Sequence, residues 1–440
     1  MAYRRSSQGG RKGPLTAVLA AVLVVATAVA VFGGCGGKDL PAQSGSGPAP
    51  QGSSGMAPPA GGGSSQAQTA DAPQGEYRAV WLTYLEYQGM DMSSEASFRT
   101  AVATAFNQIA ALGANTVVAH VRPFSDALYR SALFPWSHLL TGAQGADPGY
   151  DPLAVMVEEA HGRGLRLEAL VNPYRIRGAG GAPGTLAESN PAALYAADPE
   201  KSDWVLQQDG GTYYNPAVPE VRQLIVDGVR EICQNYQVDG VQFDDYFYPE
   251  GADDSFDQAA YERLANGADR GDWRRENVNA LVRDAYAAVK AVNPSLTFGI
   301  SPQGNNDNNY NIQYSDVALW MAESGYVDYV MPQIYWGFDY RTGSGRDDFA
   351  FENCLAGWLA LPRAQGVKLY VGLGAYRIGA GDGGSNDQAE WSSGSNLAQQ
   401  VRALRQAGAD GYGLYSYRWL FQNDQPTVAA EVEALTGANG

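Results

Sequence analysis

From residue 75 to its end, the chain alternates short apolar runs with amphipathic helical patterns. The apolar runs have the length and composition of β-strands, and they cover residues 77–84, 116–122, 166–172, 240–244, 297–301, 329–333, 368–373 and 411–417. In the segments between them apolar residues recur every three or four positions, which predicts helices near residues 95–112, 152–163, 219–236, 273–292, 315–324, 349–365, 397–407 and 426–435. Eight strands, each followed by a helix, are typical of an α/β protein of the (β/α)8 TIM-barrel type. A doubly wound open sheet is the alternative, but no Gly-rich phosphate-binding turn follows the first strand.

The N-terminal residues have the features of an export signal. A basic start with Arg4, Arg5 and Arg11 precedes an uncharged apolar run over residues 15–32. The run ends in the tetrapeptide FGGC, residues 32–35, which resembles a bacterial lipobox, so we expect residues 1–35 to be a lipoprotein signal peptide with Cys35 as the lipidated residue. An uncleaved membrane anchor is the alternative. Both predict a protein outside the cytoplasm, and the first predicts one anchored to the cell membrane through lipid on Cys35.

A linker joins this signal to the barrel. Residues 36–75 consist mainly of Gly, Ser, Pro, Ala and Gln, with almost no large apolar side chain. Such a segment cannot bury enough surface to offset the entropy of ordering, so we expect it to be disordered. The predicted domains are therefore the signal, this linker, and a barrel over residues 76–440.

Composition excludes several classes of partner. A net charge of −17 argues against nucleic acid, which is itself a polyanion. The three histidines form no HxH or HExxH pair, so no metal site is expected. The sequence indicates no other cofactor and no protein partner. Cys233 and Cys354 fall on helices well separated around the barrel, so we expect two free thiols rather than a disulfide.

The residues most indicative of chemistry lie at the end of the fourth strand. There Asp244 and Asp245 follow the strand directly and precede three aromatic residues and a proline. Side chains alternate along a strand, so Asp244 should face the barrel mouth beside Gln242, whereas Asp245 should point away or lie on the turn. We predict Asp244 as nucleophile or charge stabiliser and Asp245 as a supporting or acidic catalytic residue. The alternative is a loop carboxylate that caps the next helix.

Further candidates follow the other strands, because the carboxyl ends of barrel strands meet at one mouth. Long insertions after the second and third strands, near residues 123–149 and 173–215, should help to build it. Polar and aromatic side chains in these positions suit a sugar, and the expected substrate-binding residues are Arg122, Asp126, Asn172, Tyr174, Arg175, Tyr246, Gln333, Tyr335, Trp336, Tyr376 and Tyr417. A proton donor about 5 to 10 Å from the first carboxylate is required. The candidates are Asp245, Asp126, Glu86, Glu250 and Asp339, while His120 is expected to be a hydrogen-bonded core residue.

Eight motifs, in order between residues 76 and 336, carry a family resemblance that covers nearly everything from residue 76 to about residue 419. They are EYRAVW (76–81), HVRP (120–123), FPWS (134–137), NPYR (172–175), DGVQFDDYFYP (239–249), WRREN (273–277), GISP (299–302) and MPQIYW (331–336). Together they resemble the glycosyl-hydrolase-like family 10 of bacterial envelope proteins. The resemblance implies a (β/α)8 barrel and a glycosidase, with some relatives acting on peptidoglycan glycan strands that lack their peptides.

More distant similarities concern the fourth strand. Its sequence resembles that of α-amylase-type barrels, which implies a nucleophile at Asp244, although Gln242 stands where arginine is usual. It is also similar to family 18 chitinases, which use the acetamido group of the substrate. Tyr246 occupies the position of their catalytic glutamate, and this departure argues against that mechanism.

The sequence therefore predicts an exported, lipid-anchored glycoside hydrolase that cleaves an N-acetylhexosamine-containing glycan, with peptidoglycan as the leading candidate. A cell-wall polysaccharide-binding lipoprotein without catalytic activity is the alternative from another class. A metal-dependent deacetylase is disfavoured because paired histidines are lacking.

Overall fold

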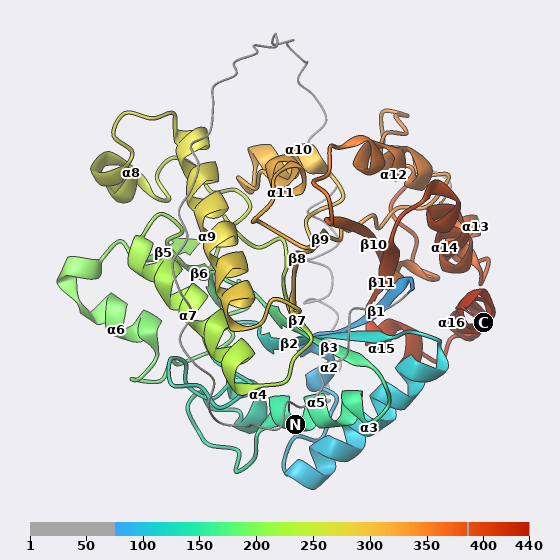
Figure 1. Ribbon diagram of the computed structural model, residues 1–440, viewed down its shortest axis with the longest axis horizontal. Helices are drawn as coiled ribbons and strands as arrows, with labels where there is room; N and C mark the ends of the chain where they lie inside the picture. The colour runs from blue at the N-terminus through green and yellow to red at the C-terminus, as the bar shows by residue number, and fades with distance from the viewer. Residues whose placement is uncertain (1–74, 385–386, 440) are drawn as a thin grey trace, which may run out of the picture. The chain divides into compact units, whose positions relative to one another are not determined.

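The computed structural model describes residues 75–384 and 387–439 and contains a closed barrel of eight parallel strands (Figure 1). The barrel strands in chain order are β1 (Tyr77–Leu82), β2 (Thr116–Arg122), β3 (Arg166–Val171), β7 (Gly240–Phe243), β8 (Thr297–Ile300), β9 (Tyr329–Val330), β10 (Lys368–Gly374) and β11 (Gly411–Tyr415). Strand β1 pairs with both β2 and β11, which closes the sheet. The predicted (β/α)8 TIM barrel is confirmed.

Helices surround the barrel and connect its strands. The eight that match the predicted helices are α3 (Glu95–Ala111), α5 (Pro152–His161), α7 (Pro219–Asn235), α9 (Arg270–Val292), α11 (Val317–Ala322), α12 (Phe351–Ala360), α14 (Asn396–Ala407) and α16 (Pro426–Asn439). Their ends follow local chemistry. Asp151 caps the backbone N–H of Ala154 at the start of α5, and Gly408 ends α14 with a φ of 81° that glycine adopts without strain.

Several strands end earlier than the sequence pattern predicts, and two of these early ends change which side chains reach the mouth. The sixth strand, β9, stops at Val330 because Pro332 has no N–H to continue the ladder, and Gln333 makes only isolated bridges to Gln303 and Gly372. The eighth, β11, stops at Tyr415, and Tyr417 already begins the short helix α15 (Tyr417–Phe421). Both changes alter which side chains can face the mouth.

The barrel interior is filled by side chains of alternate strand residues. An apolar cluster contains Tyr77, Ala79, Trp81, Val118, Leu170, Tyr329 and Met331. A polar layer lies among them, centred on the fully buried Glu168, which accepts hydrogen bonds from the hydroxyl groups of Tyr77 (3.1 Å), Thr297 (3.0 Å) and Tyr329. Gln242 extends this layer, because its Nε2 donates to the Tyr329 hydroxyl at 3.0 Å and its Oε1 accepts from the indole N–H of Trp81 at 2.8 Å. The fourth strand is thus fixed from inside the barrel, two residues before Asp244.

The insertion after β3 folds into a small antiparallel sheet. Its strands β4 (Arg175–Arg177), β5 (Val205–Gln208) and β6 (Gly211–Tyr214) pair in the order β4-β6-β5, with α6 (Pro191–Ala197) between β4 and β5. Further short helices in the connections are α2 (Tyr84–Tyr87), α4 (His138–Thr141), α8 (Gln258–Leu264), α10 (Asn306–Asn311) and α13 (Asp387–Trp391). The insertions predicted after the second and third strands therefore lie at the carboxyl ends of the barrel strands.

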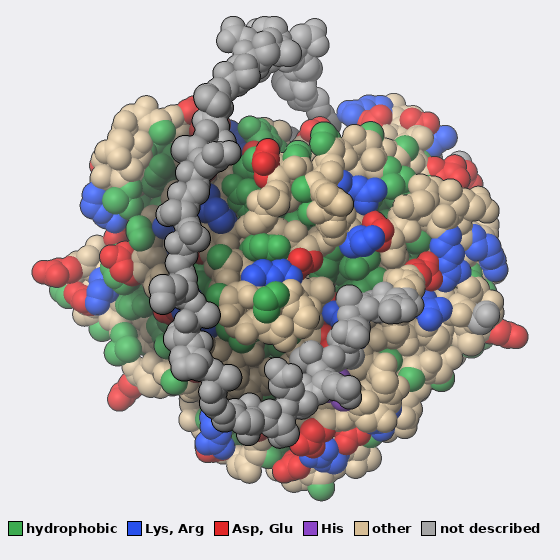
Figure 2. Space-filling model, in the orientation of Figure 1, with side chains coloured by type: hydrophobic (Ala, Val, Ile, Leu, Met, Phe, Trp, Pro, Cys, Tyr) green, Lys and Arg blue, Asp and Glu red, His purple; other side chains and the backbone are tan. Residues whose placement is uncertain are grey.

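Cys233 and Cys354 are free and buried, as predicted. Cys35, the expected signal peptide and all of the expected linker except Gly75 lie outside the described residues. Between residues 75 and 439, in the part the structure describes, no helix combines the length and the apolar character needed to cross a bilayer. On the face shown in Figure 2, acidic and basic side chains are interspersed, without the extended basic patch that typically binds nucleic acid.

Candidate active site

Two adjacent carboxyl groups lie at the carboxyl end of β7. Asp245 is only 9% exposed, and its two oxygens accept hydrogen bonds from the side-chain amides of Gln333 (3.2 Å) and Gln313 (3.3 Å). These partners follow β9 and α10, in the connections after the neighbouring strands. Asp245 therefore points toward the ends of β8 and β9 from a bend that follows the strand. Of its two expected positions, the one on the turn is confirmed and the one that points away is wrong. The alternation argument fails because β7 ends at Phe243, so neither aspartate belongs to the pleated strand.

The environments of the two carboxyls favour different protonation states. Burial and the negative charge of Asp245 raise the pKa of Asp244 to about 8, against the opposing effect of Arg175. Burial also raises the pKa of Asp245, but the amide hydrogen bonds of Gln313 and Gln333 oppose that shift by stabilising the anion. Near neutral pH the pair can hold a proton on Asp244 and a negative charge on Asp245. A separation of this kind is characteristic of acid and base roles in catalytic carboxyl pairs.

Arg175, at the start of β4, lies among aromatic rings beside this pair. Its guanidinium carbon is 4.9 Å from the ring centroid of Phe124, 5.1 Å from that of Tyr246 and 5.4 Å from that of Tyr84. Its Nε also donates to the Pro123 carbonyl at 3.1 Å. Tyr246 is 41% exposed, so this ring is available at the surface of the site.

His120 and Asn172 form a buried pair behind Arg175. The Nε2 of His120 is 3.1 Å from the Asn172 Oδ1, and its Nδ1 accepts from the backbone N–H of Tyr84 at 3.4 Å. Burial and the charge of Arg175 lower the pKa of His120 to about 3, so the ring is neutral with its proton on Nε2. His120 is thus a hydrogen-bonded core residue, as expected, and Asn172 is held by it and by the Pro123 carbonyl at 3.2 Å.

Three tyrosines form an aromatic wall at the ends of the last three strands. The Tyr335 ring lies 5.5 Å from that of Tyr376, nearly perpendicular to it, and 5.9 Å from that of Tyr415. Trp81 supports Tyr415 from inside the barrel at 5.9 Å. Burial raises the pKa of Tyr335, and the neighbouring tyrosines and then Asp245 add to the shift, so this wall stands beside the carboxyl pair. Ring faces of this kind suit the apolar faces of sugars.

Three predicted binding residues lie away from the mouth. A β-bulge between His120 and Arg122 turns Arg122 to the outside of the barrel, where its guanidinium carbon lies 4.3 Å from the Phe134 ring centroid. Tyr174 is fully buried, and the charges that act on the pKa of its hydroxyl belong to Arg222 and Asp284 on the outer helices α7 and α9. Tyr417 follows the early end of β11, and its hydroxyl donates to Gln108 on α3 at 2.6 Å. These positions correct the expectation that the three side chains face the substrate.

Two more predicted residues serve loop structure. Asp126 is fully buried and accepts hydrogen bonds from Nδ1 of His138 (2.8 Å) and the side chain of Gln144 (3.0 Å), which organises the insertion after β2. Trp336 is 8% exposed and stacks on Phe349 at 5.0 Å. Both side chains are buried in these contacts, and Asp126 Oδ1 and Trp336 Nε1 are buried without a hydrogen-bond partner.

The remaining candidate proton donors do not approach the pair. Glu86 is fully buried and accepts from the Thr83 N–H (2.8 Å) and hydroxyl (2.6 Å), the Ser416 hydroxyl and the Arg418 N–H (3.2 Å), so it links the ends of β1 and β11. Glu250 and Asp339 are exposed. Of the five candidates, Asp245 is the one whose charge acts on Asp244.

Sequence reasoning missed several residues of the site. Tyr84, Phe124 and Tyr415 directly follow or end strands, so their position could have singled them out. Gln313 could not be found this way, because it lies in a connection after a helix. Its Oε1 is buried without a hydrogen-bond partner, beside Asp245. Over the described residues no three His, Cys, Asp or Glu side chains are placed to hold a metal ion.

Comparisons with known proteins agree with this geometry. Residues 76–393 match the family described as Glycosyl hydrolase-like 10. The glycosyl hydrolase YngK of Bacillus subtilis is 35% identical over 353 residues, which are 75% of this chain and 66% of that protein. The glycosyl hydrolase DigH of Escherichia coli K12 is 33% identical over 356 residues, 74% of this chain and 78% of that protein.

Among solved structures, the fold is similar to the glycoside hydrolase domain of PgaB (BpsB) from Bordetella bronchiseptica. The TM-score is 0.56 with 14% sequence identity, over 82% of this chain and 99% of that domain. This likeness concerns the fold, and the family follows from the sequence matches. The chain belongs to the Glycosyl hydrolase-like 10 family and is a glycoside hydrolase.

Proposed function

We propose that this chain is an exported, lipid-anchored enzyme that hydrolyses N-acetylhexosamine-containing glycans, with peptidoglycan glycan strands as its substrate. The observation that carries the catalytic part is the Asp244–Asp245 pair, whose surroundings favour opposite protonation states. The basic and apolar N-terminal residues before Cys35 support export and anchoring, and the Gly- and Ser-rich segment after it would give the barrel reach into the cell wall. The acidic net charge argues against nucleic acid as a partner.

In the proposed reaction Asp244 is the general acid. It gives its proton to the glycosidic oxygen while the bond from that oxygen to the anomeric carbon breaks. Asp245, kept ionised by Gln313 and Gln333, stabilises the positive charge at the anomeric carbon, either as a nucleophile or by its charge alone. Water then supplies a hydroxyl to the anomeric carbon, and its other proton returns to Asp244. This assignment reverses the roles expected from strand alternation.

The surrounding groups would bind the sugar. Tyr246, Tyr335 and Tyr376 offer ring faces to the sugar. Arg175, at the start of β4, lowers the pKa of Asp244 through its positive charge. The two carboxyls come from consecutive residues, so the sugar would be approached by both from the β7 end of the mouth.

Defined glycan oligomers and product identification by mass spectrometry test the proposal. We expect Asp244→Asn and Asp245→Asn each to lower turnover by about 10²–10⁴-fold, with little change in melting temperature. An aryl glycoside whose phenol leaves without protonation should restore much of the activity of D244N and none of that of D245N. Asp254→Asn is the matched control, since its carboxyl is 84% exposed on the loop that follows. Full turnover by D244N or D245N would reject the assignment.

A wild-type protein that binds glycan strands and releases no product would contradict the catalytic part of the proposal. For the anchor, incorporation of labelled fatty acid should be lost in Cys35→Ser.

A further inference from the structure

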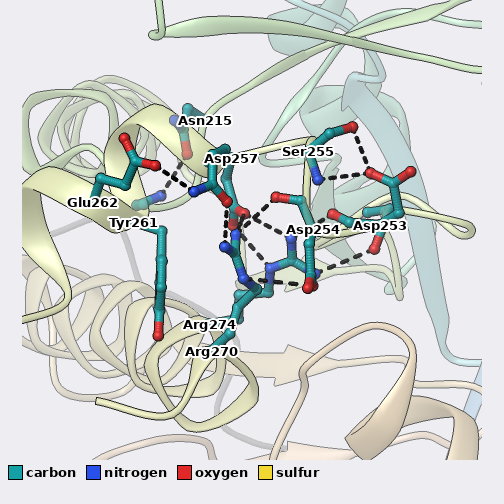
Figure 3. Close-up of polar contacts among 12 residues, drawn as sticks. Asn215, Asp253, Asp254, Ser255, Asp257, Tyr261, Glu262, Arg270 and Arg274 are labelled. Atoms are coloured by element: carbon teal, nitrogen blue, oxygen red, sulfur yellow. Dashed lines mark hydrogen bonds and ion pairs between the residues drawn. The ribbon is translucent and has the colours of Figure 1, made fainter. Parts of the chain in front are cut away.

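One motif of the sequence, WRREN at residues 273–277, has no part in the site described above. Its second residue, Arg274, lies on α9 beside Asp257 and Asp253 (Figure 3) and is fully buried, yet each of its five N–H groups has an acceptor. Nε and NH2 bind the two oxygens of Asp257 at 2.8 and 2.6 Å, and NH2 also donates to the Asp253 carbonyl at 2.7 Å. NH1 donates to the Ala252 carbonyl at 3.2 Å and to the Tyr314 hydroxyl at 2.9 Å.

These contacts join two segments of the mouth. Residues 252–257 belong to the loop that follows the carboxyl pair, whereas Tyr314 belongs to the connection between α10 and α11. The guanidinium carbon is also 5.2 Å from the Tyr248 ring centroid and 4.8 Å from that of Tyr314. Arg274 therefore holds both segments at a fixed separation. Lysine, with three donors and no planar fork, could not make the same set of bonds.

The second segment leads directly to Asp245. Tyr314 has a φ of 54°, an uncommon conformation for a residue with a side chain, and its hydroxyl is held by Arg274. The preceding residue is Gln313, which is 2% exposed and donates to Oδ2 of Asp245 at 3.3 Å. A change in the position of Tyr314 would thus move the amide that stabilises the Asp245 anion.

Stability alone is a weak reason for this arrangement. A buried ion pair such as Arg274–Asp257 contributes little net stability compared with well-packed apolar residues, because both charges lose their hydration. Its directional bonds do, however, fix the relative positions of the groups that they join.

We propose that Arg274 is a positioning residue for the catalytic carboxyl pair, acting through Tyr314 and Gln313 on Asp245. The inference rests on the proposed function for its kinetic consequence. In physical terms, the amide of Gln313 keeps the pKa of Asp245 down, so displacement of that amide raises it. Activity that requires ionised Asp245 is lost as the pH falls through this pKa. The acidic limb of the pH–rate profile should therefore move to higher pH.

Tyr314→Phe is the main test, because it removes one hydroxyl and leaves the ring. We expect it and Arg274→Lys to move the acidic limb upward by about one pH unit and to lower kcat about tenfold, with a smaller change in KM. The matched control is Arg270→Lys on the same helix. Arg270 also binds Asp257, at 3.0 Å, and the Asp254 carbonyl, at 2.8 Å, but has no bond to Tyr314. The acidic limb of R270K should lie at the same pH as that of the wild type.

Two outcomes would overturn the proposal. One is that Y314F and R274K lose stability or activity while the acidic limb of their pH–rate profiles stays at the wild-type pH. The other is that R270K shifts the acidic limb as far as they do. Titration of the Asp245 carboxyl by 13C NMR, assigned with D245N, measures the pKa shift without turnover. An inactive wild-type protein in which Y314F still raises this pKa would reject the proposed function and support the positioning role.

Discussion

Removal of the positive charge of Arg175 should extend activity to higher pH. The acid form of Asp244 is required, so the rate falls as the pH rises through its pKa of about 8. Arg175 holds that pKa down, and the variant Arg175→Met should therefore raise it and move the basic limb upward. Tyr246 links the two groups, since its N–H donates to Asp244 at 3.1 Å and its ring centroid lies 5.1 Å from the guanidinium carbon. An opposite charge near a carboxyl typically lowers its pKa by about one to three units, so loss of this charge should move the basic limb by about one pH unit, or about 1.4 kcal/mol.

The assay is kcat/KM on purified glycan strands across the pH range, which reports the ionisation of the free enzyme. Arg175→Lys keeps the charge while losing the planar contact with the rings, so its basic limb should stay near that of the wild type even if its rate falls. Arg177→Met is the matched control on the same strand, because Arg177 binds the Pro183 carbonyl at 2.7 Å and is not among the main groups that shift the pKa of Asp244. A basic limb that stays in place or moves downward in R175M would refute the electrostatic reasoning.

Two further predictions concern the barrel. Gly299→Ala should destabilise the protein by roughly 2 to 3 kcal/mol, because a Cβ there would lie 2.0 Å from Cζ of the buried Tyr329, whose hydroxyl is held by Glu168. Denaturant unfolding measures this, with Gly343→Ala, which meets no atom within 4 Å, as control; equal stability of the two variants would contradict it. Cys233 and Cys354 should resist a thiol reagent in the native protein, because burial raises the pKa of each thiol to about 12. Rapid labelling before unfolding would contradict that expectation.

The barrel itself could be predicted from periodicity, because each strand and helix buries a face that leaves a regular pattern in the sequence. The start of β2 and its end were both predicted, yet the side chain of Arg122 faces the opposite way from the prediction. A single bulge reverses the alternation, and a bulge depends on contacts with the neighbouring strand rather than on local composition. In the same way, Pro332 shortens β9, so that Gln333 leaves the ladder and turns its amide to Asp245.

The site could be predicted only as far as strand ends define it. Asp244 and Arg175 were found because they directly follow strands or open an insertion, and both lie at the mouth. Tyr417 was predicted to lie at the mouth because the last strand was expected to end there, but β11 ends two residues earlier. Gln313 was missed, since its place beside Asp245 depends on a helix, a left-handed residue and a buried arginine. The spacing of residues in the sequence does not predict that these three features act together to place Gln313.

This difference bears on how the two aspartates acquire separate roles. Asp244 and Asp245 are identical in chemistry and adjacent in the chain, so nothing in the strand that carries them distinguishes a proton donor from an anion. The distinction comes from other segments: amides after α10 and β9 stabilise the charge on Asp245, and that charge, together with burial, keeps a proton on Asp244. A substitution that weakens either amide should therefore make Asp245 easier to protonate, so the acidic limb should move to higher pH. The basic limb should stay in place, because Asp245 is still ionised where Asp244 loses its proton and its charge acts on Asp244 as before.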